Sequence, residues 1–312
     1  MTTNRNYAAT LRLPSTQFPM RALASGNAAG READLGNLML GTGSARRAED
    51  AYRTLRNCFR WMLGSLSHFD GVLPAGGSFP ALDRHVSSVL AARAENGGAR
   101  VETLVETAKD DLMAFYFDVR KDALYCDGKD SPRRLAALAV TELAFETLCG
   151  MARETVPHLV AEASGHFSPK LAPGFRPPPP PPGWEDVRRV RKAVLSLLDK
   201  QRAARSFNSS LDLHLDLFVE DPALARSLSE SQWDTAETLC VSAARTYGGK
   251  PGGGRALPTW LDGVWVSLRP ADGMRCARSY RFSTDTSSDP DFPGLSPRDA
   301  AAVRELGLQS AG

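Results

Sequence analysis

The sequence has few cysteines and no long apolar run. Its five cysteines are scattered, and none belongs to a C-x-x-C pair, which argues against a disulfide framework and against a complete zinc site. No apolar run approaches the roughly 20 residues that a transmembrane helix needs, and no signal-peptide core follows the start. We therefore expect a cytoplasmic protein in a reducing compartment, with no membrane partner. Residues 1–31 contain arginines and no acidic residue, as a transit peptide would, but no amphipathic stripe accompanies them.

An excess of one charge is also missing. The net charge is +2 over 312 residues, so a nucleic-acid partner can be inferred only from where the charges lie. With 42% apolar and 24% charged residues, the composition is typical of a globular protein, and the length is sufficient for two domains.

Two stretches combine an apolar helical stripe with cations and aromatic residues. Over residues 52–70, apolar residues recur at helical spacing, while Arg53, Arg56 and Arg60 fall three or four residues apart on another face. Residues 114–127 read A-F-Y-F-D-V-R-K-D-A-L-Y-C-D, and here an apolar helix changes into a charged end with an aromatic residue beside it. We expect a partner to dock at this end.

Breaks in these patterns divide the chain into four parts. Residues 1–44 have weak periodicity and predict a poorly ordered segment. Residues 45–167 carry four helical patterns, which predict an antiparallel bundle. Residues 168–183 contain a run of six prolines and predict an extended spacer, or alternatively a proline-rich ligand. Residues 184–312 begin with a basic helix, continue into the alternating pattern of a strand, and predict a small α+β domain. The expected fold class is mainly α.

The two helical stretches resemble the anticodon-binding helical domain of the isoleucyl-tRNA synthetase family, which belongs to the class I aminoacyl-tRNA synthetases. In that family a Y-R-x-x-R-N-x-x-R-x-x-L-G-x-L-x-x-F-D helix is followed by an F-Y-F-D-x-R-K-D-x-L-Y-C-D segment, and both motifs occur here. Beyond the prolines, R-A-A-R-S-F-N-S-S-L-D is similar to the family's R-x-x-K-x-I-G-S-S-L-E. The resemblance is to the C-terminal part of the bacterial enzymes.

This resemblance implies isoleucine tRNA as the partner, bound through its anticodon arm. Arginine and lysine would contact phosphates, and a tyrosine would stack on an unpaired base, which is the usual way single-stranded RNA is recognised. Alternatively, Tyr125 and Trp61 pack at the rim of the core, and Asn57 forms a hydrogen bond within the bundle. The implied contacts are Arg53, Arg56, Asn57, Arg60, Arg120, Lys121, Tyr125, Arg202 and Arg205.

The motifs with which this family activates its amino acid do not occur in the sequence. None of the five histidines lies in a His-x-Gly-His context, and there is no Lys-x-Ser-Lys loop. No trace of the family's inserted editing domain is found either. We therefore expect no ATP site, no catalytic residue and no ligase activity from this chain alone.

The family often ends in a zinc ribbon, whose four ligand positions correspond here to Cys276, Ser279, Ser296 and Asp299. Only one of them is cysteine, and a serine hydroxyl does not deprotonate readily enough to bind structural zinc. We expect a degenerate ribbon that has lost zinc and needs no cofactor, with the last forty residues loosely packed.

Three functional hypotheses stay open. The chain is a tRNA-binding module, or a truncated or vestigial scaffold that has kept the fold and lost RNA binding, or one subunit of a split ligase whose catalytic core lies on a separate chain. Salt-dependent tRNA binding distinguishes the first hypothesis from the second.

Overall fold

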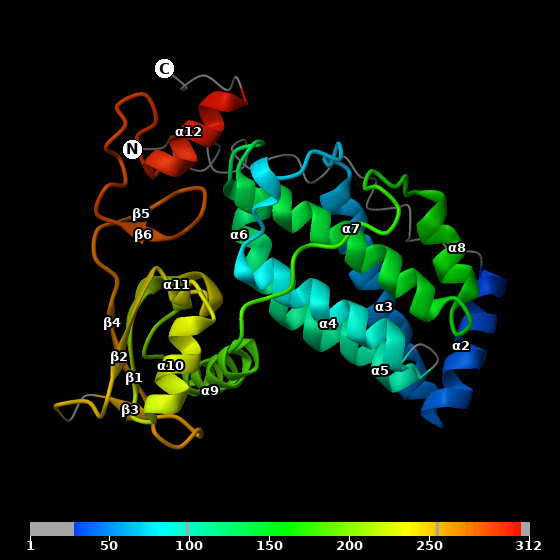
Figure 1. The fold of residues 1–312 in the computed structure, drawn as a ribbon, viewed down its shortest axis with the longest axis horizontal. Coiled ribbons are helices and arrows are strands. Elements are labelled where there is room, and N and C mark those ends of the chain that lie inside the picture. The colour runs from blue at the N-terminus through cyan, green and yellow to red at the C-terminus, as the bar shows by residue number, and fades with distance from the viewer. Residues whose placement is uncertain (1–27, 98–99, 254–255, 307–312) are drawn as a thin grey trace. The chain divides into compact units, whose positions relative to one another are not determined.

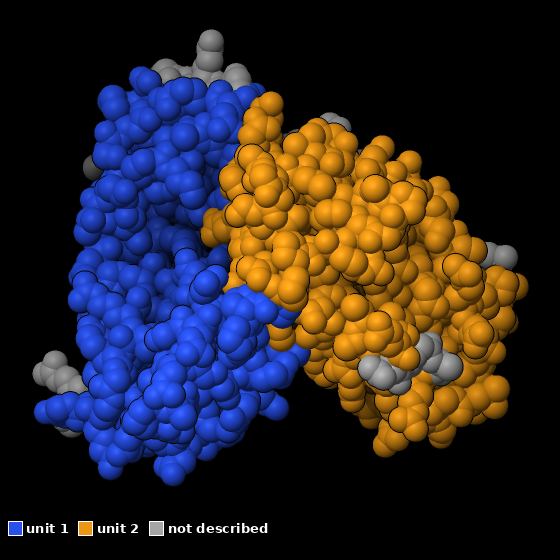
Figure 2. Space-filling view, in the orientation of Figure 1, with its two compact units in different colours: residues 1–11, 126–128, 180–312 blue, residues 12–125, 129–179 orange. Residues whose placement is uncertain are grey.

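The computed structural model describes residues 28–97, 100–253 and 256–306, which form two compact units (Figure 2). The first unit, the helical unit, contains the described residues up to 125 together with residues 129–179. The second, the mixed unit, contains residues 126–128 and the described residues from 180 onward. The division between Pro179 and Pro180 falls inside the proline-rich stretch.

Helices account for nearly all the regular structure of the helical unit (Figure 1). The third of the four predicted helical patterns is one long helix from Val101 to Cys126. Its middle part has π-helical hydrogen bonds, which give more residues per turn than an α-helix has. The elements are α2 (Ala28–Thr42), α3 (Ala45–Leu66), the turn η1 (Ala75–Gly77), α4 (Ala81–Gly97), the continuous α5 (Val101–Glu106), η2 (Thr107–Phe117) and α6 (Asp118–Cys126), then α7 (Pro132–Ala152) and α8 (Pro157–Gly165).

Helix α7 forms the centre of this unit. It contacts α3, α4 and α8, and the Phe145 ring meets the Phe59 ring of α3 edge to face at 5.5 Å. Among the described residues, α7 is the only helix long and apolar enough to cross a membrane, but 78% of its most apolar window is buried inside the structure. Its composition is therefore that of a core helix.

Helix α2 corrects the prediction of a poorly ordered segment as far as residues 28–42 are concerned; residues 1–27 lie outside the described part. Leu38 and Asp34 of α2 are fully buried, and the Asp34 carboxylate accepts hydrogen bonds from the backbone N–H groups of His158 (3.2 Å) and Leu159 (2.9 Å) at the start of α8. The glycines that suggested disorder allow close helix packing, since a Cβ at Gly41 would overlap the Val101 side chain.

The chain that follows α8 packs back onto the helical unit. We call residues 167–179 the strap. Glu142 of α7 accepts hydrogen bonds through Oε1 from the backbone N–H groups of Lys170 (2.7 Å) and Leu171 (2.8 Å), and the Phe167 ring lies 4.4 Å from that of Phe145. At its far end, Arg84 donates from Nε to the Pro179 carbonyl at 2.8 Å. Up to Pro179 the chain is therefore not a free spacer, because hydrogen bonds to Glu142 and Arg84 hold it against the helical unit.

The mixed unit is built on a four-stranded sheet of order β2-β1-β4-β3, in which β1 pairs parallel with β2 and antiparallel with β4. A second sheet joins β5 and β6. These elements confirm the predicted class, mainly α with a small α+β region. They are α9 (Trp184–Ala203), η3 (Ser210–Asp212), β1 (Leu213–Val219), α10 (Pro222–Glu230), α11 (Thr235–Thr238), β2 (Ala243–Gly248), β3 (Leu257–Pro258), β4 (Val264–Pro270), β5 (Met274–Arg275), β6 (Phe282–Ser283) and α12 (Pro297–Glu305).

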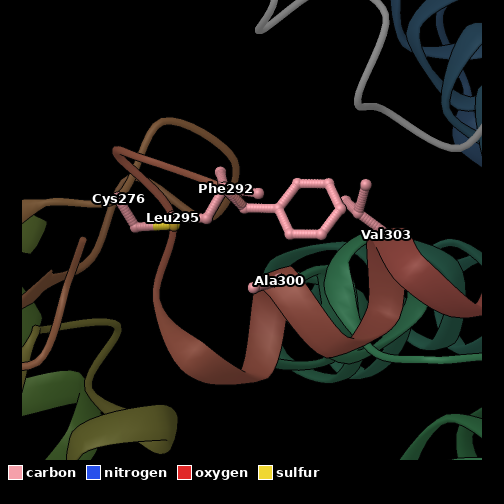
Figure 3. Close-up of a cluster of buried hydrophobic side chains, with 5 residues drawn as sticks. All are labelled: Cys276, Phe292, Leu295, Ala300 and Val303. Atoms are coloured by element: carbon pink, nitrogen blue, oxygen red, sulfur yellow. The ribbon is translucent and has the colours of Figure 1, made fainter. Parts of the chain in front are cut away.

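The end of the described chain has a small core of its own (Figure 3). The cluster joins the β5–β6 region to α12, and its members are at most 3% exposed. The prediction that the last forty residues are loosely packed is therefore wrong for the segment that contains this cluster, Cys276 to Val303; residues 307–312 lie outside the described part. The cluster consists of Cys276, Phe292, Leu295, Ala300 and Val303.

Candidate nucleic-acid interface

The side of α3 that faces solvent carries a row of cations. Arg53 and Asn57 are exposed, and Arg56 and Arg60 are partly exposed. Arg53 pairs with Asp50 at 2.5 Å, but both side chains are more than half exposed, and such a surface pair is worth at most about 1 kcal/mol. The pair therefore does not prevent Arg53 from binding a phosphate. The structure thus places all four predicted α3 residues on an accessible surface.

Two further cations lie on the same helix and were missed by the sequence analysis. Arg46 and Arg47 are exposed in the first turn of α3. Arg46 precedes Arg53 by seven residues and Arg53 precedes Arg60 by seven, so the three fall on one side of the helix. The seven-residue spacing of Arg46, Arg53 and Arg60 in the sequence is the signal that identifies Arg46.

An aromatic cluster lies where the end of α3 meets the long helix. The Trp61 ring stacks on Phe117, with centroids 3.9 Å apart, and meets the Tyr125 ring edge to face at 6.4 Å. Burial raises the pKa of the Tyr125 phenol, while hydrogen bonds with Trp61 and Ser65 oppose the rise. Tyr125 is therefore a neutral, partly buried ring held against Trp61, which matches the alternative of rim packing and leaves only part of the ring for a base.

Lys121 and Arg120 are neighbours in sequence with opposite environments. Lys121 is exposed and pairs with Asp118 one turn earlier, at 2.7 Å. Arg120 is 1% exposed; its Nε donates to Asp83 Oδ1 at 3.1 Å, and a terminal nitrogen donates to Asp83 Oδ2. The Tyr116 hydroxyl donates to the same Oδ1 at 2.7 Å.

The prediction that Arg120 contacts RNA is therefore corrected. Its guanidinium already neutralises a buried carboxylate, and an RNA phosphate cannot reach it without opening the bundle. The π-helical winding of Thr107–Phe117 rotates the following residues relative to an ideal α-helix, and α4 supplies Asp83 on the side to which Arg120 turns. Burial and the Asp83 charge raise the pKa of the Tyr116 phenol well above its usual value, so this hydroxyl stays a donor.

Arg202 and Arg205 belong to the mixed unit, at the end of α9. Arg202 pairs with Asp199 at 3.4 Å and lies over the Phe207 ring, 5.7 Å from its centroid. Arg205 is exposed and has a positive φ of 58°. Both cations are accessible. A third cation of the predicted basic face, Arg191, is buried and donates to the Thr238 carbonyl at 2.9 Å, so this basic face is smaller than the sequence indicates.

The four positions that resemble zinc ligands lie together, and the side chains of three of them surround one carboxylate oxygen of the fourth, Asp299. Ser279 and Ser296 each donate to Asp299 Oδ2 at 2.8 Å, and the Cys276 thiol donates to it at 3.1 Å. Asp299 is fully buried, and the buried Arg278 guanidinium lies 3.6 Å from its other oxygen, Oδ1. We call these five side chains the Asp299 network. Among the described residues, no group of three or more His, Cys, Asp or Glu side chains is placed to hold a metal ion.

Comparison with curated proteins finds isoleucine–tRNA ligases. The chain is 34% identical over 285 residues to that of Bartonella henselae, a match that covers 82% of this chain and 28% of that protein. It is 37% identical to the ligase of Brucella suis and 36% identical to that of Agrobacterium fabrum, each over 279 residues and with the same coverage. The chain thus spans less than a third of the length of these relatives. No family model matches it.

Proposed function

We propose that this chain, a homologue of isoleucine–tRNA ligases over most of its length, is a tRNA-binding module that holds the anticodon arm through α3. The observation that carries the proposal is the row of arginines on the solvent side of α3. Guanidinium groups form bidentate hydrogen bonds with phosphates, and a helix that presents several of them along one side suits an RNA backbone.

Lys121 and Tyr125 extend the proposed surface beyond α3. The Trp61–Tyr125 contact brings the end of the long helix to the end of α3, so a cation and a partly exposed ring lie beside the arginine row. In this proposal Lys121 binds phosphate and Tyr125 contacts an unpaired base at its exposed edge, whereas Arg120 supports the helix from inside. Arg202 and Arg205 provide further phosphate contacts from the mixed unit.

The proposal assigns no catalytic chemistry to this chain. Activation of isoleucine would need the ATP-binding motifs, which the sequence does not contain. The proposal also includes a zinc-free ribbon. Asp299 and Cys276 are the only strong donors of the four positions, and the buried Arg278 cation beside Asp299 would repel Zn²⁺. The residues present therefore do not suit a structural zinc ion.

The test is binding of the full chain to isoleucine tRNA, modified and unmodified, against an unrelated tRNA over a range of salt concentrations. We expect selective binding that weakens as salt rises. Replacement of Arg53, Arg56 and Arg60 by alanine removes three phosphate contacts and should lower the slope of log K against log salt by roughly 2 to 3, at about 0.7–0.9 for each contact.

A matched control replaces three exposed cations of the same unit that lie outside α3, namely Lys109, Lys129 and Arg153. This variant has the same change in net charge and should keep most of the selective binding. Equal losses in both variants would indicate non-specific attraction, and no preference for isoleucine tRNA would leave the scaffold hypothesis. Charging of tRNA by this chain only when a second chain is added would support a split ligase.

A further inference from the structure

Helices cover one face of the four-stranded sheet, and among the described residues of the mixed unit no helix packs on the other face. The covered face carries Leu213, Leu215, Leu217 and Val219 of β1 with Val264 and Val266 of β4, all buried. Figure 1 shows α9 and α10 on one side of this sheet. Because successive residues of a strand point to opposite faces, the residues between these positions form the other face, and on β1 they are partly exposed.

A row of ring-bearing residues crosses this open face along the pairing register. Phe218 of β1 is opposite Tyr247 of β2 and opposite Trp265 of β4, and Trp265 is opposite Pro258 of β3. The row thus has one member on each strand. The Phe218 and Tyr247 rings are stacked, with centroids 5.2 Å apart and planes 19° apart. Tyr247 is 39% exposed, and Phe218 and Trp265 are partly exposed.

A polar row lies beside the ring-bearing row. Asp216 of β1 is opposite Arg245 of β2 and Ser267 of β4. Arg245 is exposed, and no ion pair of its guanidinium occurs within the described chain. One pair further along, Arg269 and His214 both approach Asp272, at 2.9 Å and 3.2 Å.

On the side of the ring-bearing row away from the polar row, the open face carries one acidic and one basic side chain. Glu220, directly after β1, pairs with Lys250 at 3.0 Å. The open face is therefore close to electrically neutral, and Arg245 is the one described cation on it that forms no ion pair within the described chain. Because the charges of this face nearly cancel, we expect its ligand to be recognised mainly through stacking on planar aromatic groups, with a single phosphate contact. A ligand recognised by charge alone would need a face with a net charge.

Sheet stability does not account for an exposed ring row. A cross-strand aromatic pair contributes roughly 0.2–1 kcal/mol, and that contribution does not require the third ring, Trp265. Exposed aromatic surface costs free energy in water. In sheets that bind single-stranded RNA, rings on neighbouring strands of the open face stack on successive bases, and each such contact tolerates any base because every base has a flat face.

We propose that the open sheet face of the mixed unit is a stacking platform for unpaired RNA bases, formed by Tyr247, Phe218 and Trp265, with Arg245 placed to hold a neighbouring phosphate. The choice of RNA as the ligand rests on the tRNA-binding function proposed above. The platform is a separate site in a separate unit, and it binds single-stranded segments in preference to duplex, whose bases already stack on one another.

The experiment uses the full chain and a fluorescein-labelled single-stranded RNA heptamer of mixed sequence, with a duplex of equal length for comparison, read by anisotropy. We expect the heptamer to bind more tightly than the duplex. Tyr247→Ala should weaken heptamer binding about 5- to 150-fold, as loss of one base stack does, whereas Tyr247→Phe, which keeps the ring, should stay within about twofold. Arg245→Ala should lower the salt slope by roughly one phosphate contact.

Two controls keep the result interpretable. Met274→Ala removes a side chain of the same unit that is 56% exposed and lies outside the four-stranded sheet, so it should leave binding unchanged. Trp265→Leu keeps an apolar side chain on β4 and removes the ring, so it should reproduce the loss if the row acts as a platform. Thermal unfolding of each variant confirms that the sheet is intact.

Failure of this proposal is distinguishable from failure of the α3 proposal. Heptamer binding that survives Tyr247→Ala and Trp265→Leu but is lost on replacement of the α3 arginines overturns the platform and leaves the tRNA-binding function standing. Heptamer binding that depends on Tyr247 in a chain that does not bind tRNA supports the platform and overturns the α3 proposal. Self-association or capture of an acidic peptide through Tyr247, without heptamer binding, overturns the platform in favour of a protein partner.

Discussion

At the residue scale, the ion pair between Arg120 and Asp83 has almost no contact with water. The two side chains are 1% and 0% exposed, and Tyr116 completes the hydrogen bonding of the carboxylate. Removal of one partner from a buried pair leaves the other charge uncompensated, which costs about 3–5 kcal/mol. We expect Arg120→Ala to lower the free energy of unfolding by this amount, measured by urea denaturation at neutral pH.

The control for this prediction is the next residue. Lys121→Ala removes an exposed cation that pairs within its own helix and should change the free energy of unfolding by less than about 1 kcal/mol. Its effect should appear in tRNA binding instead. If Arg120→Ala left stability unchanged and weakened tRNA binding as Lys121→Ala does, the burial of Arg120 would not describe the protein in solution.

The difference between these two neighbours could not be predicted from the sequence. Both lie in the charged end of the same helix, and their local patterns are alike. Asp83 precedes Arg120 by 37 residues, so the pairing depends on how α4 packs against the long helix and on the π-helical turn before it. The same holds for Arg191, which donates to the backbone carbonyl of Thr238 at the end of α11, 47 residues along the chain. The solvent-facing position of the α3 arginines could be predicted, because α3 is regular and its exposed side follows from its own periodicity.

At the element scale, the strap depends on one buried carboxylate. Glu142 is fully buried, and its Oε1 accepts the backbone N–H groups of Lys170 and Leu171. A hydrogen bond to a charged group is worth about 1.5–3 kcal/mol. We expect Glu142→Ala to speed hydrogen exchange of these two amides by roughly tenfold or more if they exchange by local opening, measured by NMR or mass spectrometry.

Glu146 provides the matched control, since it lies one turn further along α7 and is exposed. Burial raises the pKa of its carboxyl, and the nearby Glu142 charge adds to the rise, while Arg176 of the strap opposes it. Unlike Glu142, Glu146 accepts no hydrogen bond from the amides of Lys170 and Leu171 in the described structure. Glu146→Ala should leave their exchange unchanged. Equal exchange in wild type and Glu142→Ala would show that ring contacts hold the strap without the carboxylate. These contacts are Phe167 with Phe145, and Phe175 with Phe79 at 5.7 Å between centroids.

Composition cannot predict that the strap and α2 are anchored to the helical unit. Proline and glycine indicate free chain when a segment is considered alone. The strap instead becomes ordered through Glu142, Arg84 and two aromatic anchors, none of which is recognisable as its partner from sequence. In α2, glycine reflects close packing against α5 and α8. The strands at 213–219 and 264–270 could be predicted, because alternating apolar and polar residues indicate a strand with one buried face.

At the scale of the whole molecule, the fold class follows from the sequence because each unit carries its own periodic signals. Helical stripes specify the first unit, and short alternating runs specify the sheet of the second. The packing of the segment from Cys276 to Val303 could not be predicted from its resemblance to a zinc ribbon. Without four thiolates the analogy predicts loose chain, whereas the structure has a buried carboxylate at the centre and an apolar cluster beside it (Figure 3).

This arrangement predicts that the folded state does not depend on metal. Asp299 Oδ2 accepts hydrogen bonds from Cys276, Ser279 and Ser296, and a fourth from Arg298 at 3.3 Å. The carboxylate also lies beside the buried Arg278, so it links the segment around Cys276 to α12, as a metal ion would. Thermal unfolding should therefore be the same with and without EDTA. Asp299→Ala removes a fully buried carboxylate that lies beside Arg278 and should lower the free energy of unfolding by about 3–5 kcal/mol, whereas Asp289→Ala, which removes an ion pair to the half-exposed Arg304, should have only a small effect on stability. A lower unfolding temperature in EDTA, restored by added zinc, would show instead that these positions hold a metal ion.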